Sequence, residues 1–91
     1  METFIFKIGT GDNVSVNRNQ LYTVTYKPID KDAEATTPEI KVVGIVTGLS
    51  LDLRSLIIRN DDMSNTSVPM SNIISVKAGN TTTETGNASG D

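Results

Sequence analysis

Clustered carboxylates are the first candidates for chemistry in this chain of 91 residues, because neighbouring aspartates can bind a divalent cation. The candidates are Asp52, Asp61 and Asp62. Adjacent carboxylates in a loop usually point apart, and the segment after Asn60 lacks the spaced acids and closing glutamate of a calcium loop. The spacing therefore predicts no metal site.

Serine hydroxyls are the second candidates, and they need a base to become nucleophiles. The chain contains no histidine and no cysteine, so it lacks the commonest general base at neutral pH, the commonest metal ligand and any thiolate. We therefore expect a non-enzymatic protein with no catalytic residue and no cofactor. The serines considered are Ser50, Ser55, Ser64 and Ser71.

A third set combines cations with aromatic rings, on which single-stranded nucleic acid could stack: Lys41, Arg54, Arg59, Tyr22 and Tyr26. Eight basic and eleven acidic side chains give a net charge of -3, which repels phosphate unless the basic groups cluster. The simpler interpretation is that the cations are solvated and the tyrosines are half-buried strand residues. Nucleic-acid binding through this set is therefore the alternative hypothesis.

Short strands must position all of these residues. Runs rich in β-branched residues alternate apolar with polar positions, end at Gly, Asn, Asp, Ser or Pro, and leave no helix-period stripe. This pattern is typical of an all-β protein of about five to six antiparallel strands. The expected strands are residues 3–8, 21–27, 39–47, 56–60, 68–70 and 73–77, and residues 14–16 could extend one of them.

Individual residues mark the ends and bends of these strands. Pro28 ends the strand before it, because proline cannot donate a hydrogen bond to a ladder. Gly44, in the middle of the longest strand, predicts a bend or bulge where the sheet coils sharply. Ser71 and Asn72 fit a single tight turn between the last two strands.

Length and composition predict one domain and a tail. Residues 1–78 form the expected small β-barrel domain, and residues 79–91 form a polar tail with nothing to bury, which we expect to be disordered. The acidic segment 29–38 is an expected exposed loop. No apolar run approaches the ~20 residues of a membrane span, and the start lacks a basic signal region, so we expect a cytoplasmic protein with no membrane association.

The stretch 40–76 resembles the SH3-like and Sm-like small barrels. In these barrels a strand with a bent glycine, here Gly44, runs through a short loop into the next strand, and a tight turn, here at Ser71 and Asn72, separates the last two strands. The resemblance implies a single SH3/Sm-like barrel that forms ring-shaped oligomers through edge strands. The first Sm signature is matched at apolar Val46, Leu49, Leu53 and the strand around Ile57.

The chain departs from the Sm-like pattern at the RNA-contacting positions. Ser50 replaces an aspartate, Arg54 replaces a base-reading asparagine, and Ser71-Asn72 replaces an Arg-Gly pair. The resemblance therefore implies the fold and not the uridine pocket.

Small acidic barrels with low-complexity tails also resemble small bacteriophage-encoded proteins, which would place this one in a host cytoplasm. Because small barrels serve many functions, the resemblance does not choose one. Our main hypothesis is a binding or assembly module that uses its barrel edges, with another protein or a second copy of the chain as partner.

Overall fold

The computed structural model describes residues 2–28 and 38–81. This part of the chain is all-β, with seven strands and one short 3-10 helix, so the expected fold class is confirmed and the expected number of strands was too low. No helix in it is long and apolar enough to cross a membrane. The elements are β1 (Thr3–Lys7), β2 (Asn13–Asn17), β3 (Leu21–Tyr26), β4 (Ile40–Leu49), β5 (Ser55–Arg59), β6 (Asn65–Pro69), η1 (Met70–Asn72) and β7 (Ile73–Ala78).

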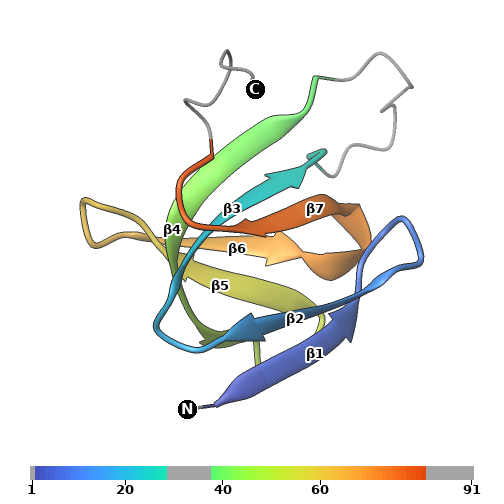
Figure 1. The fold of residues 1–91 in the computed structure, drawn as a ribbon, viewed down its shortest axis with the longest axis horizontal. Coiled ribbons are helices and arrows are strands. Elements are labelled where there is room, and N and C mark those ends of the chain that lie inside the picture. The colour runs from blue at the N-terminus through green and yellow to red at the C-terminus, as the bar shows by residue number, and fades with distance from the viewer. Residues whose placement is uncertain (1, 29–37, 82–91) are drawn as a thin grey trace.

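The strands form two antiparallel sheets (Figure 1). One contains β1 and β2, and the other has the order β6-β5-β4-β3-β7. Its edge strands β6 and β7 are joined by η1, but within the described residues they do not pair with each other. Closure of this sheet into a barrel is therefore not confirmed. Strands β3 to β6 form a sequential antiparallel meander, and β7 crosses over to pair with β3.

The β1–β2 hairpin is more extensive than the sequence predicted. All five residues of β1 pair with all five of β2, from Thr3 opposite Asn17 to Lys7 opposite Asn13. Gly11 makes the connecting turn with φ +92°, a conformation that glycine adopts without steric cost. Residues 14–16 thus belong to a full strand and not to an extension of another.

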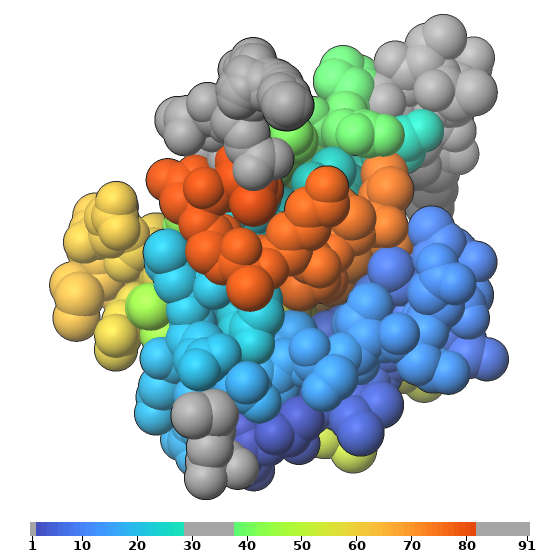
Figure 2. Space-filling view, viewed as in Figure 1, coloured from blue at the N-terminus to red at the C-terminus, as the bar shows by residue number. Residues whose placement is uncertain are grey.

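The core lies where the hairpin packs on the inner face of the five-stranded sheet. Val16 of β2 is completely buried, as are Val24 of β3 and Ile58 of β5. Figure 2 shows the hairpin, in blue, packed directly against the atoms of β3 and β7. The full set of buried apolar residues is Phe6, Ile8, Val16, Tyr22, Val24, Val46, Leu56, Ile58, Val68, Met70 and Ile73.

The longest strand, β4, has a glycine and a bulge at different positions. A Cβ on Gly44 would lie 2.5 Å from both the carbonyl oxygen of Arg59 and Cγ2 of Ile58. The register with β5 shifts between Val46 and Gly48, three residues beyond the glycine. Gly44 is thus needed because β5 passes close to it, and the expected irregularity lies around Thr47.

The described chain continues past the expected domain boundary at residue 78. The amide of Gly79 donates to the carbonyl of Leu21 at 2.9 Å, and the amide of Thr81 donates to Oγ1 of Thr23 at 2.9 Å. These bonds attach residues 79–81 to β3. The rest of the expected tail, residues 82–91, and the expected acidic loop, apart from Pro38, lie outside the described residues.

Candidate binding surfaces

The structure divides the five sequence-predicted residues among separate regions and removes Tyr22 from the surface. Only 6% of Tyr22 is exposed. Its hydroxyl accepts a hydrogen bond from the amide of Asn17 at 2.7 Å and donates to Oε1 of Gln20 at 3.3 Å. Tyr22 therefore holds the β2–β3 turn and offers no ring face for stacking. Tyr26, at the end of β3, is half-buried against the core.

Lys41 and Arg59 lie on the outer face of the five-stranded sheet. Lys41 is opposite Thr25, and Arg59 is opposite Ile45, which shares a face of β4 with Lys41. Lys77 carries no sequence signal that would select it, yet the register places it on this face too, opposite Thr23. Lys41 and Lys77 border a small cleft of about 170 Å³ that also includes Glu39 and both threonines.

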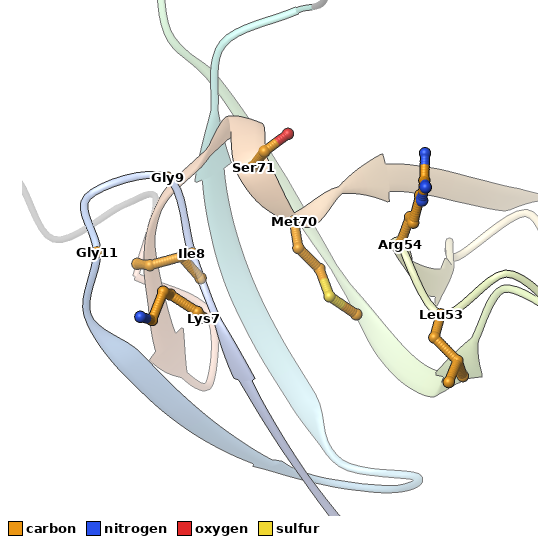
Figure 3. Close-up of a pocket in the computed structure, with 8 residues that line it drawn as sticks. All are labelled: Lys7, Ile8, Gly9, Gly11, Leu53, Arg54, Met70 and Ser71. Atoms are coloured by element: carbon orange, nitrogen blue, oxygen red, sulfur yellow. The ribbon is translucent and has the colours of Figure 1, made fainter.

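Arg54 lies on a different surface, at an open groove of about 560 Å³ between the β1–β2 loop and the β4–β5 loop (Figure 3). Buried Ile8 and Met70 contribute its apolar part. Lys7 lies on one side, and Leu53 with Arg54 lies on the other. This volume is within the range of ligand sites, and the groove is the larger of the two hollows described.

The β4–β5 loop that carries Arg54 is held by its own polar groups. The hydroxyl of Ser50 donates to Oδ1 of Asp52 at 2.6 Å, and the amide of Arg54 donates to the same oxygen at 3.0 Å. These two bonds, together with the charge of Arg54, lower the pKa of Asp52 below its ordinary value. Asp52 therefore organises the loop and is not free to bind a ligand through that oxygen.

Leu53 differs most from its sequence interpretation. It matched an apolar position of the small-barrel signature, yet it is 67% exposed and adopts φ +62°. A branched side chain with positive φ is a backbone outlier. The loop thus presents an apolar side chain in an unfavourable conformation beside Arg54.

The β5–β6 loop repeats this construction. Oδ1 of Asp62 accepts hydrogen bonds from the hydroxyl of Ser64 at 2.5 Å and from its amide at 3.0 Å, and both lower the pKa of Asp62. Met63 follows with φ +72°. Asp52 and Asp62 thus lie in separate loops, and no group of three potential metal ligands occurs in the described part of the chain.

The edges of the five-stranded sheet are a further candidate surface. At one end of the ladder between β5 and β6, the backbone N–H of Asn60 donates a hydrogen bond to the carbonyl of Ser64. A bond from the Met70 amide to the carbonyl of Arg54 lies at the other. Residue pairs along an antiparallel ladder alternate between hydrogen-bonded and non-hydrogen-bonded pairs. Counting from these two bonds, Ser67 and Ile57 form a non-hydrogen-bonded pair, so the N–H and C=O of Ser67 point away from β5.

The edge strand β7 can be analysed in the same way. The bond from the Gly79 amide to Leu21 identifies the hydrogen-bonded pairs of the β3–β7 ladder. By alternation, the backbone groups of Val76 and Ala78 point away from β3. The start of this edge is occupied, because the carbonyl of Ile73 accepts a bond from the Gly9 amide at 3.0 Å.

Comparison with protein-family models, with curated proteins and with solved structures found no match to this chain.

The charge of the described part differs from that of the whole chain. Five of the eleven acidic residues, but only one of the eight basic residues, lie in segments 29–37 and 82–91. The described residues therefore carry six acidic and seven basic side chains. The one ion pair among them joins Arg18 to Glu2. Lys7, Lys41, Arg54, Arg59 and Lys77 are thus available cations on the folded surface.

Proposed function

We propose that this protein is a non-enzymatic assembly module, in which a strand of a second copy adds to an open edge of the five-stranded sheet. The main support for this proposal is the edge strand β6. Its only backbone partner within the described residues is β5, and it contains no charged side chain. Exposed edges are usually protected by charge or by proline. In β6 the proline, Pro69, lies at the end of the strand, so the uncharged edge at Ser67 is suited to strand addition.

The two edges of the sheet are different, which determines the kind of assembly. β6 offers the outward backbone groups of Ser67, and β7 offers those of Val76 and Ala78. Addition of β6 of one copy to β7 of the next is a head-to-tail contact, which produces a ring if it closes and a filament if it does not. The position of η1 before the last strand agrees with the SH3/Sm-like resemblance, which favours the same arrangement.

The substitution Ser67→Pro tests this function. Proline removes an N–H that points away from β5, so the β5–β6 ladder is retained while the edge is blocked. We expect the wild type to assemble and Ser67→Pro to sediment as a monomer of 9.8 kDa. The dissociation constant of the assembly should rise at least about tenfold in this variant.

Ser67→Ala is the matched control, because it retains the N–H and should assemble like the wild type. Sedimentation velocity over a concentration series measures all three proteins, and circular dichroism establishes that each is folded. A wild type that remains monomeric at about 1 mM, or a folded Ser67→Pro that assembles normally, would contradict the proposal.

A second candidate function, nucleic-acid binding, is favoured by the outer face of the sheet. Lys41, Arg59 and Lys77 project from this one face without ion-pair partners in the described residues. Phosphate contacts would come from this face, whereas Arg54 lies elsewhere and Tyr22 is buried.

Charge reversal on the outer face separates the two functions. If nucleic acid is the partner, labelled single-stranded RNA or DNA binds with a steep salt dependence, and Lys41→Glu with Lys77→Glu weakens binding at least about tenfold. Fluorescence anisotropy at low and near-physiological salt measures this. Ser67→Pro should leave such binding unchanged, and flat titrations would exclude this candidate.

A further inference from the structure

The groove beside Arg54 combines features that the assembly proposal does not use. It lies between the loop after β1 and the loop after β4, next to η1, and away from the outward backbone groups of β6. Figure 3 shows Lys7 and Ile8 on one side, Leu53 and Arg54 on the other, and Met70 between them. The groove therefore has an apolar centre with a cation on each side.

The charged side chains that line the groove favour an anionic occupant. The residues that line it include Lys7 and Arg54 and no acid. The nearest acids along the chain are already engaged, since Asp12 accepts a hydrogen bond from Thr10 at 2.9 Å and Asp52 is bonded within its own loop. Neither cation has an ion-pair partner in the described residues.

Leu53 supplies an independent argument for a partner. Its positive φ is unfavourable for a leucine, and its exposure leaves an apolar side chain in water. The neighbouring Leu51 is fully exposed on the same loop. Neither leucine contributes much to the core, so folding alone does not explain apolar residues here.

We propose that this groove binds an extended acidic peptide segment of a partner protein, with one apolar side chain between two acidic ones. The apolar side chain packs on Met70, Ile8 and Leu53. One carboxylate pairs with the guanidinium of Arg54, which can bond it with two N–H groups, and the other pairs with the amine of Lys7. The open shape suits a segment of chain better than an enclosed small molecule.

A designed peptide tests the site without knowledge of the natural partner. The probe is a fluorescein-labelled peptide with leucine between two pairs of aspartates, flanked by glycine and serine. Its comparison peptides replace either all aspartates with asparagine or the leucine with glycine. We expect saturable binding by fluorescence anisotropy that weakens with salt, and at least about tenfold weaker binding of each comparison peptide.

Three variants of the full chain locate the site. Arg54→Gln should weaken binding at least about tenfold, whereas Lys41→Gln, the same charge change on the outer face, should change it less than about twofold. Leu53→Asn should weaken binding about threefold or more. Asparagine tolerates positive φ better than leucine, so the melting temperature of this variant should stay level or rise. Loss of binding without loss of stability distinguishes a contact residue from a structural one.

Several results would overturn the proposal. One is that Arg54→Gln and Lys41→Gln weaken peptide binding equally. Another is that the asparagine peptide binds as tightly as the aspartate peptide, and a third is that binding does not saturate at about 1 mM protein. Arg54-dependent binding of a labelled single-stranded oligonucleotide with none of the acidic peptide would also overturn it. Ser67→Pro should retain peptide binding, so failure of the assembly proposal and failure of this one are distinguishable.

Discussion

Ile58→Ala is expected to lower the free energy of unfolding by about 2–5 kcal/mol, because it leaves a cavity at the centre of the core. Ile58 is completely buried on β5, between Val46 of β4 and Thr66 of β6. A domain this small has a total stability near the lower end of about 5–15 kcal/mol. In a domain of this size, each kcal/mol lost lowers the melting temperature by about 4–8 °C. The variant therefore loses a large share of the total stability and comes close to global unfolding.

Ile57→Ala is the matched control for this cavity. Ile57 is the next residue on β5, has the same side chain, and is only half-buried on the opposite face. Urea unfolding followed by circular dichroism should show a midpoint shift for Ile57→Ala well below that for Ile58→Ala. Equal shifts would mean that the inner face of β5 does not form the main core.

Alternation of apolar residues was enough to predict most of the strands and the faces of their side chains, although it did not identify β2 as a separate strand. Phe6, Val24 and Val68 are buried because side chains along a strand alternate between core and solvent. The pairing of edges could not be predicted in this way, since closure depends on long-range register. The pattern therefore indicated an all-β fold correctly but left the barrel unconfirmed.

The candidate surfaces were less predictable than the fold. Charge and aromaticity selected Lys41, Arg54 and Tyr22 as one set, yet the register distributes them between an outer face, a groove and the core. Neither Lys7 nor Leu53 carries a local signal of a binding surface, because a lone lysine at a strand end and a leucine in a loop are ordinary residues. Their proximity arises from loops about forty residues apart, which no local pattern reports.

Gly44→Ala is expected to be strongly destabilising, although it adds only one methyl group. Its Cβ would meet the carbonyl oxygen of Arg59 and Cγ2 of Ile58, both at 2.5 Å. Backbone cannot move aside as a flexible side chain can, so β5 must shift away from β4 at this point. Overpacking of this kind costs about 1–3 kcal/mol, and we expect the upper part of that range.

Gly48→Ala is the control, because it lies on the same strand and its Cβ would meet nothing within 4 Å. Alanine replaces glycine in both variants, so the change in unfolded-chain entropy is the same, and any difference in stability arises from contacts in the folded state. Paired urea titrations should therefore show Gly44→Ala destabilised and Gly48→Ala near the wild type or slightly above it. Equal losses of stability would contradict this explanation, because a Cβ at position 48 meets no neighbour and neither glycine has a positive φ. If only Gly44→Ala is destabilised, the constraint at position 44 is the close passage of β5, which leaves no room for a side chain there.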